Sequence, residues 1–254
     1  MVPLNDFASA SLTIAGVINP PVDFLSVLTV TKPLIIKADE DEVLDIELEE
    51  DFIKANEKMA ELNRRSFDRH RIKVVDFMGS IGAGKTSLIE KLVESLKKKY
   101  KVGVIAGDTS TAIDAERIAK HGVPSIQINT GRECHLDAPL VRKASKKLLR
   151  HGVNLILIEN VGNLICPAEF PLGAHKRVVV VSVTEGEYMI KKKGDIFRAA
   201  DVGVINKKDM SGPMGIDVSE LVKDALNANP KIKAVVTSTR TGEGIPELIE
   251  ALDL

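Results

Sequence analysis

The chain has 254 residues, 44% of them hydrophobic, and a formal net charge of -1. This length exceeds a typical domain of about 150 residues, yet α/β folds of this size often form a single core. The balanced charge argues against a general binder of nucleic acid or of an anionic membrane, and no apolar run approaches the ~20 residues of a transmembrane helix.

The first part of the chain carries no clear structural pattern. Residues 1 to about 40 show no periodicity that continues beyond them, and an acidic run at residues 39 to 42 closes the segment. We therefore expect residues 1–40 to form a poorly ordered N-terminal extension. Its apolar stretch is broken by two prolines and no Lys or Arg precedes Lys32, so a secretory signal is not expected.

An amphipathic helix is expected next, from Asp51 to His70. Its apolar stripe is thin and consists of Phe52, Met59 and Phe67, with Asn56 and Asn63 completing the spacing. This helix opens the main unit, which we expect to span residues 51–254.

Strand-like apolar runs then alternate with helical stretches. The expected strands are Ile72 to Met78, Val102 to Ala106, Ser125 to Asn129, Leu155 to Glu159, Val178 to Val183, Val202 to Asn206 and Ala234 to Thr237. The expected helices are Thr86 to Lys99, Asp114 to His121, Ala138 to His151, Val218 to Asn227 and Pro246 to Leu252. Continuous Val and Ile runs imply burial on both faces. The pattern predicts a doubly wound α/β fold with a mostly parallel sheet of about seven strands.

A phosphate-binding loop follows the first of these strands. The segment from Gly79 to Thr86 matches G-x-x-x-x-G-K-[ST] between a strand and a helix, the context that this pattern requires. Its glycines let the backbone approach phosphate, and the helix N-terminus favours an anion. Lys85 is expected to neutralise the β and γ oxygens, and Thr86 to ligate Mg²⁺. The residues expected to contact nucleotide here are Gly79, Gly82, Ala83, Gly84, Lys85, Thr86 and Ser87.

Acidic residues follow two further strands. Glu159 ends an apolar run and Gly162 comes three residues later, as in the segment of P-loop GTPases that senses Mg²⁺ and the γ-phosphate. We expect Thr86, Asp108 and Glu159 to hold Mg²⁺ and Gly162 to offer its N–H to the γ-phosphate. Asp114 either serves the reaction or caps the helix that follows it, and both readings stay open. The expected catalytic residues are Lys85, Asp108, Asp114, Glu159 and Gly162.

The sixth strand ends in a guanine-reading pattern, N-K-x-D, at Asn206 to Asp209. Asp209 can accept hydrogen bonds from the ring N–H and the amino group of guanine, and a site of this kind can reject a mismatched ligand by roughly 10⁴-fold. A later loop resembles the S-A-K loop that supports the base. The residues expected to bind the base of GTP or GDP are Asn206, Lys207, Asp209, Ser238, Thr239 and Arg240.

A metal site is predicted at the same edge of the sheet. Cys134 and His135 follow the third strand, and Cys166 follows the fourth. Two thiolates and an imidazole could converge on a soft or borderline divalent ion, with one position left for water or another subunit. The alternatives are two free cysteines or a disulfide between them. His175 is kept as an extra candidate ligand.

With these residues assembled, the chain from about Asp51 to its end resembles the HypB family of nickel-incorporation GTPases. The resemblance rests on residues 77–86, 129–138, 159–167, 184–186 and 197–201. It implies a cytoplasmic P-loop GTPase of the SIMIBI type that dimerises with nucleotide. It also implies Ni²⁺ or Zn²⁺ at Cys134, His135 and Cys166, and nickel loading of the [NiFe] hydrogenase large subunit with a small zinc-containing partner.

Three departures and three alternatives accompany this resemblance. Residues 1 to about 40 do not resemble the start of the family. Residues 1 to 60 contain neither Cys nor His, so the nickel-storage motif of many bacterial members is missing, and residues 191–194 lack a Pro expected nearby. Urease-type nickel GTPases carry Cys-Pro-His, whereas Cys134-His135 and Cys166-Pro167 are separate here. A P-loop small-molecule kinase conflicts with Asp209, and a metal buffer conflicts with an intact Lys85.

Overall fold

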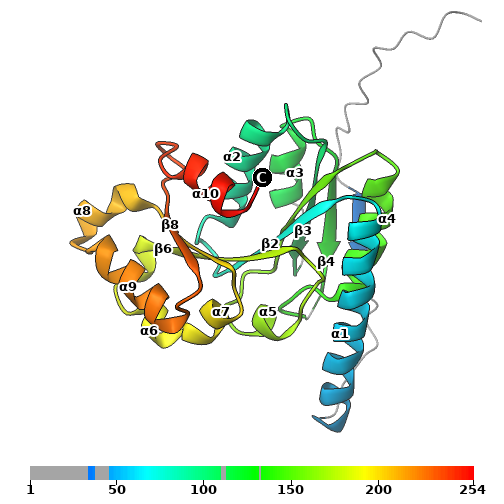
Figure 1. The fold of residues 1–254 in the computed structure, drawn as a ribbon, viewed down its shortest axis with the longest axis horizontal. Coiled ribbons are helices and arrows are strands. Elements are labelled where there is room, and N and C mark those ends of the chain that lie inside the picture. The colour runs from blue at the N-terminus through cyan, green and yellow to red at the C-terminus, as the bar shows by residue number, and fades with distance from the viewer. Residues whose placement is uncertain (1–33, 38–45, 110–112, 132) are drawn as a thin grey trace, which may run out of the picture.

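The computed structural model describes residues 34–37, 46–109, 113–131 and 133–254 (Figure 1). Their strands form one eight-stranded sheet in the order β1-β4-β3-β5-β2-β6-β7-β8, and every neighbouring pair is parallel. The strands are β1 Leu34–Lys37, β2 Lys73–Gly79, β3 Val102–Asp108, β4 Ser125–Asn129, β5 Leu155–Glu159, β6 Lys176–Ser182, β7 Val202–Asn206 and β8 Lys233–Val236. The predicted doubly wound α/β fold is confirmed, with one strand more than expected.

The additional strand is β1, which lies inside the segment expected to be a poorly ordered extension. Its four residues pair with Ile126 to Asn129 of β4 at the edge of the sheet. A run of four residues is shorter than a typical strand, so it offered no periodicity to detect. The rest of residues 1–40 lies outside the described part of the chain.

Helices cover both faces of the sheet. They are α1 Ile46–Arg69, α2 Lys85–Leu96, α3 Ile113–Ala119, α4 Ala138–Leu149, α5 Cys166–Glu169, α6 Met189–Lys192, α7 Gly194–Arg198, α8 Ser211–Met214, α9 Val218–Ala228 and α10 Ile245–Ala251, with 3-10 turns η1 Val183–Glu185 and η2 Lys208–Met210. The short helices α5 to α8 were not expected. Among the helices described, none combines the length and apolar character that crossing a lipid bilayer requires.

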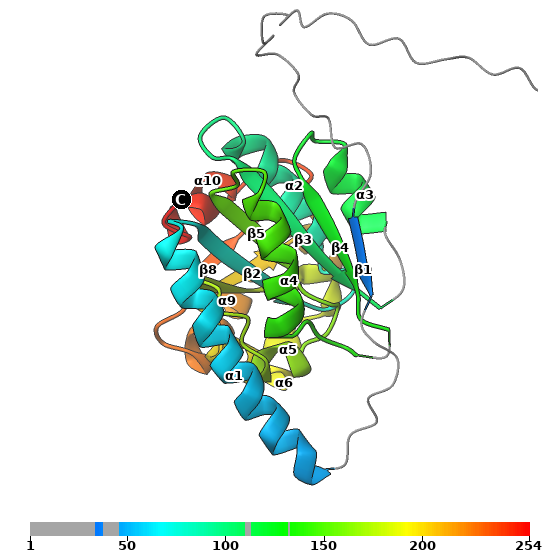
Figure 2. The same ribbon diagram turned by 90° about the vertical axis from the view of Figure 1, so that its right-hand side faces the viewer.

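Three apolar clusters form the core. One lies under α2, α3 and α10, a second under α1 and α4, and a third under α6, α7 and α9 (Figures 1 and 2). Strand β2 shows why both faces must be covered: Val75 and Phe77 belong to the first cluster, whereas Val74 and Met78 face the other side. Successive strand residues point to opposite faces of the sheet, so the continuous apolar run of β2 is buried on both faces.

Helix α1 carries two buried asparagines within its apolar stripe. Asn56 accepts a hydrogen bond from the Ala138 N–H and donates to the Pro171 carbonyl. Asn63 donates to the carbonyls of Ala138 and Leu172. The helix runs alongside α4 (Figure 2), and this asparagine pair joins the first residue of α4 to the loop before β6. Polar residues in the stripe are therefore satisfied by backbone groups rather than exposed.

The carboxyl ends of the strands meet at one edge of the sheet. Strand β2 lies between β5 and β6, where the chain reverses the direction in which it adds strands. In open α/β sheets, ligands bind in the crevice at such a switch point. The residues predicted to bind nucleotide and metal all follow strands at this edge.

Candidate functional site

The phosphate-binding loop connects β2 to α2, and its backbone demands glycine at several positions. Gly82 and Gly84 have φ values of 81° and 94°, a region that L side chains rarely adopt. A Cβ at Gly84 would also lie 2.4 Å from Asn206 Nδ2. Asn206 donates to the carbonyl of Ala83, so the guanine-pattern asparagine closes tightly over the loop and keeps its shape.

Lys85 begins α2 and turns back into the loop. Its ammonium donates to the carbonyls of Gly79 and Ser80, each at 3.0 Å. Burial lowers the pKa of Lys85, and the carboxylates of Glu159 and Asp114 oppose that shift. A buried cation inside a loop of this shape is well placed to meet an incoming phosphate.

Thr86 brings two carboxylates together. Its hydroxyl lies 2.7 Å from Glu159 Oε1 and 2.9 Å from Asp114 Oδ1. Burial, followed by repulsion from Asp114, raises the pKa of Glu159 to about 7, and Glu159 Oε2 is buried with no hydrogen-bond partner. One hydroxyl and two carboxylates, one of them with an unsatisfied oxygen, are a donor set that suits Mg²⁺.

Asp114 therefore contacts Thr86 of the phosphate loop, which a residue that only capped its own helix would not do. Helix α3 begins at Ile113, so Asp114 lies within its first turn and its carboxylate points to Thr86. Asp108 ends β3 and its charge acts on Lys85. Ser87, the last predicted residue of the loop, accepts a hydrogen bond from Arg117.

The chain from Glu159 to Cys166, here called the sensor segment, lies against the phosphate loop. A Cβ at Gly162 would be 2.3 Å from Ile81 Cγ1 and 3.1 Å from the Ile81 nitrogen. Asn163 forms an antiparallel bridge with Gly79. Only glycine fits this approach, so the backbone of the sensor segment touches the loop that would hold the phosphates.

The predicted base-binding residues are brought together by β7, β8 and the loops after them. Ser238 donates to Asp209 Oδ1 at 2.7 Å, and Arg240 Nη1 lies 3.8 Å from Asp209 Oδ2. Thr239 lies between them. Lys207 adopts a left-handed backbone conformation and donates to the carbonyl of Gly82, which ties the base loop to the phosphate loop.

Two contacts made by η1, one with the phosphate loop and one with the base loop, were not predicted from the sequence. Ser80 donates to Glu185 Oε2 at 2.6 Å, and Lys207 also donates to the hydroxyl of Thr184. Thr184 and Glu185 entered the sequence analysis only through the family resemblance, because no spacing rule links residues after β6 to a loop after β2. The contact shows that η1 braces the phosphate loop from its other side.

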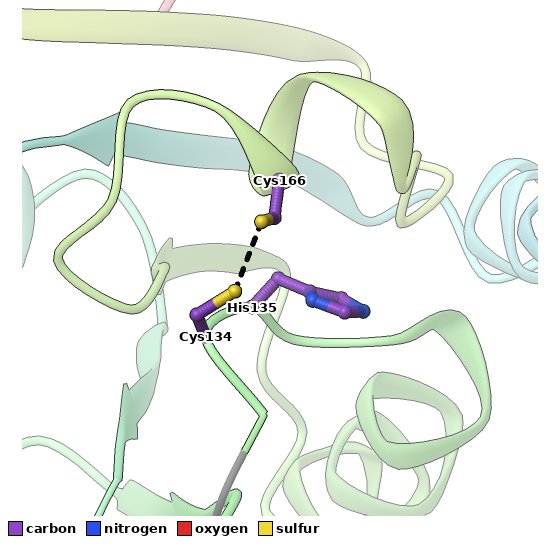
Figure 3. A group of neighbouring side chains, drawn as sticks. All are labelled: Cys134, His135 and Cys166. Carbon is purple, nitrogen blue, oxygen red and sulfur yellow. Dashed lines mark hydrogen bonds between the residues drawn. The ribbon is translucent and has the colours of Figure 1, made fainter. Parts of the chain in front are cut away.

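Cys134, His135 and Cys166 converge as predicted (Figure 3). Their ligand atoms all lie within 4.8 Å of one another. The two sulfur atoms are 2.9 Å apart, and the Cys134 thiol donates a hydrogen bond to Cys166 Sγ. No disulfide joins the two cysteines. Burial and the neighbouring Cys134 raise the pKa of Cys166 to about 11. Two soft sulfurs and one imidazole fit Zn²⁺ or Ni²⁺, and binding must release protons from the thiols.

His135 is held by an aromatic residue that the sequence analysis did not identify. Its ring stacks on Phe170 with centroids 3.8 Å apart and an interplanar angle of 24°, and Phe170 in turn packs against Phe52 of α1. Burial lowers the pKa of His135 to about 4, and its Nδ1 is buried with no hydrogen-bond partner. A neutral imidazole with an unpaired nitrogen is ready to ligate a metal.

His175 lies apart from this cluster. Its Nδ1 accepts a hydrogen bond from the Val74 N–H, and its Nε2 lies 2.9 Å from Asp68. Both ring nitrogens are engaged in linking α1 to β2, so His175 has a structural role and is not the extra ligand that was considered.

The comparisons with known proteins agree with this geometry. Residues 73–236 match the family described as CobW/HypB/UreG, nucleotide-binding domain. The probable hydrogenase maturation factor HypB of Methanocaldococcus jannaschii is 48% identical over 211 residues, which cover 83% of this chain and 95% of that protein.

Two solved structures of HypB proteins are also similar to this chain. The crystal structure of hydrogenase maturation factor HypB from Archaeoglobus fulgidus is 42% identical, with a TM-score of 0.74 over 79% of this chain and 98% of that one. The crystal structure of HypB from Helicobacter pylori in complex with nickel is 32% identical, with a TM-score of 0.73 over 78% of this chain and 95% of that one.

A more distant likeness concerns the fold alone. The signal recognition particle receptor FtsY from Elizabethkingia anophelis is 17% identical, with a TM-score of 0.53 over 82% of this chain and 80% of that one, and it shares the α/β fold. From the matched domain and the 48% identical relative, the chain belongs to the HypB family of hydrogenase maturation factors, within the CobW/HypB/UreG group of nucleotide-binding proteins.

Proposed function

We propose that this chain is a GTP-hydrolysing metallochaperone that binds nickel or zinc and assists nickel insertion into [NiFe] hydrogenase. The observation that carries the proposal is the cluster of Cys134, His135 and Cys166, whose ligand atoms lie within 4.8 Å of one another. Cys166 ends the sensor segment that touches the phosphate loop. A transferable metal and a hydrolysable nucleotide would therefore share one short piece of chain.

The proposed nucleotide chemistry uses residues that already face one another. Lys85 would exchange its two carbonyl contacts for the β and γ oxygens of GTP. Thr86, Asp108 and Glu159 would hold Mg²⁺, with Asp108 bound through water. Asp114, whose carboxylate also lies at the Thr86 hydroxyl, would join them or orient the attacking water. An ion held there would supply positive charge against the charge that develops on the phosphates. Water would attack the γ-phosphorus as the bond to the bridging oxygen breaks, GDP would leave with the electron pair of that bond, and the proton of the attacking water would pass to the phosphate product or to solvent.

Gly162 is the proposed sensor of the γ-phosphate. Its backbone lies beside Ile81 of the phosphate loop, so a small shift would bring its N–H toward a γ oxygen. Loss of the γ-phosphate would release that N–H. Cys166 lies four residues later, and this motion would change the distance between the two thiols, which gives a physical route from GTP state to metal grip.

The base would be read by Asp209, with Asn206, Lys207 and the loop of residues 238–240 forming the frame. Ser238 already holds one carboxylate oxygen of Asp209, which leaves the other to accept from guanine. Arg240 lies 3.8 Å from that oxygen and is exposed, so it can swing aside.

The proposed partners follow from the open side of the site. Three ligands per chain leave a fourth metal position for water or a second subunit. Apolar side chains exposed at this edge include Ile81 at 85%, Ile165 at 56% and Tyr188 at 55%, and such residues favour a nucleotide-dependent homodimer. A small zinc-containing protein is proposed as the nickel-delivery partner, and the hydrogenase large subunit as the indirect recipient. Free thiols suit a reducing compartment, which supports a cytoplasmic location.

The proposal is tested by measuring GTP turnover and molecular size with GDP, a GTP analogue and Ni²⁺ in combination. We expect turnover that needs Lys85, a size increase with the GTP analogue, and nickel binding lost in Cys134→Ser and Cys166→Ser. A chain that transfers phosphate to a metabolite instead of water, or that binds nickel equally well without both cysteines, would contradict it.

A further inference from the structure

Asn160 occupies an unusual place between the two sites. It follows Glu159, precedes the γ-phosphate sensor Gly162 by two residues, and is only 1% exposed. Its backbone N–H donates to the carbonyl of Phe77 at 2.9 Å, which fixes its position beside β2. No step of the nucleotide chemistry uses its side chain, yet a buried amide must have its hydrogen bonds satisfied.

One oxygen of that side chain serves two donors. Asn160 Oδ1 accepts from the N–H of Val161 at 3.0 Å and from the N–H of Leu136 at 3.0 Å. Val161 belongs to the sensor segment, and Leu136 directly follows the metal ligand His135. The same oxygen atom thus joins the loop that would sense the γ-phosphate to the loop that carries Cys134 and His135.

The other end of the amide is anchored in the core. Asn160 Nδ2 donates to Asp76 Oδ1 at 3.2 Å, and Asp76 is fully buried on β2. Arg177 lies 4.0 Å from the second oxygen of Asp76 and donates to the carbonyls of Pro167 and Ala168, which adjoin Cys166. Because Oδ1 faces two N–H donors and Nδ2 faces a carboxylate, the amide has one favoured orientation.

We propose that Asn160 is the positioning residue that couples the nucleotide state to the metal grip of the Cys134–His135 loop, a proposal that rests on the function proposed above. Two N–H groups share one acceptor. When Val161 moves with Gly162 toward the γ-phosphate, the hydrogen bond from its N–H to Asn160 Oδ1 weakens. The hydrogen bond from the Leu136 N–H to the same oxygen then strengthens, and Leu136 is held more closely. The route through Cys166 moves one ligand, and the route through Asn160 moves the other two.

The experiment measures a ratio of affinities. Ni²⁺ affinity is determined by competition with a chromophoric chelator in the GDP state and in the state bound to a non-hydrolysable GTP analogue. In the wild type the two affinities should differ by a factor within the roughly 5- to 150-fold range typical of coupled sites. In Asn160→Ala the ratio should fall clearly below the wild-type value, to the part that the route through Cys166 supplies alone, because the shared acceptor is gone.

A pair of variants that exchanges Asn160 and Asp76 tests whether a lower ratio reflects loss of this hydrogen bond or general damage to the fold. Asn160→Asp keeps an acceptor for Leu136 but sets a carboxylate against Asp76, so its ratio should also fall. Asp76→Asn combined with Asn160→Asp restores a hydrogen bond between the two positions with donor and acceptor exchanged, and the ratio should recover. As a second readout, the thiolate charge-transfer absorption of bound Co²⁺ reports that both cysteines ligate in every variant.

Asn63→Ala is the matched control. It also removes a buried asparagine that bonds the backbone near His135, but it lies on α1, away from the sensor segment. Its metal affinity can change, whereas its ratio should stay at the wild-type value. An unchanged ratio in Asn160→Ala, or a double variant that remains as low as Asn160→Asp, overturns the role of Asn160 alone. A ratio of one in the wild type overturns the nucleotide–metal coupling of the proposed function itself.

Discussion

Replacing Glu159 by glutamine should stabilise the ligand-free protein while damaging its response to Mg²⁺. The wild-type carboxylate is buried, and its pKa is raised from 4.5 to about 7. At about 1.36 kcal/mol per unit of pKa, charging this group in the folded protein costs roughly 3 kcal/mol. Glutamine keeps an acceptor for the Thr86 hydroxyl and removes the charge.

The sign of the pH dependence follows from the raised pKa. Between pH 4.5 and about 7 the folded state holds a proton that the unfolded state releases, so the stability that wild-type Glu159 contributes falls as pH rises through this window. The glutamine variant lacks this loss. Its free energy of unfolding should exceed that of the wild type by about 3 kcal/mol at pH 8 and by about 1 kcal/mol or less at pH 5.

Urea unfolding at pH 5 and pH 8, with and without Mg²⁺ and GDP, measures both effects. With Mg²⁺ and GDP the order should reverse, because the charge that was costly becomes a ligand and its replacement binds the ion poorly. Glu116→Gln makes the same change at an exposed position of α3 and serves as the control. A stability gap that is the same at both pH values, or full Mg²⁺ dependence in Glu159→Gln, would refute the reasoning.

Four further outcomes are expected. Asp209→Asn should weaken GTP binding and improve xanthine nucleotide binding, because base and side chain exchange donors for acceptors; unchanged GTP affinity in a titration would show that Asp209 does not read the base. Gly162→Ala should push the sensor segment off Ile81 and lower GTP turnover more than GDP affinity, whereas equal turnover would remove Gly162 from the mechanism. Phe170→Ala should cost about 3 kcal/mol in urea unfolding and weaken Ni²⁺ binding, with Phe170→Leu recovering most of the stability but not the metal affinity; nickel affinity unaffected in both would mean that the stack on His135 is only structural. GTP and nickel affinities should change each other by the same factor, since coupling between two binding sites is reciprocal, and calorimetric titrations in both orders that disagree would break the proposed two-site scheme.

Strong local patterns made most of the fold predictable. The strands Leu155–Glu159 and Val202–Asn206 have the bounds expected from their apolar runs, because a strand buried on both faces leaves a nearly continuous run of Val, Ile and Leu. Strand β1 and the short helices α5 to α8 were missed. The short helices have only four or five residues each, which is less than two helical turns, so their sequence carries no helical periodicity to reveal them. Strand β1 has four residues and depends on its pairing with β4, a distant part of the chain.

The candidate site divides in the same way. Residues in contiguous motifs, such as Lys85, Thr86 and Asp209, were identified because motif spacing encodes their geometry. The convergence of Asp114 with Glu159 could only be left open, since capping a helix and meeting Thr86 use the same residue type. Phe170 beneath His135 had no signal at all, because a lone aromatic after a turn is indistinguishable from core packing until the two loops are seen together.

The asparagine pair on α1 supports the backbone near the proposed metal site from outside the nucleotide-binding domain. The domain shared with CobW and UreG proteins begins at residue 73, after α1 has ended at Arg69. Every residue proposed to touch nucleotide lies within or after that domain, whereas the loops that carry the metal ligands are also tied down by a helix outside it. Substitutions along α1 should therefore change how firmly the proposed site holds metal without changing any residue proposed to bind or hydrolyse GTP.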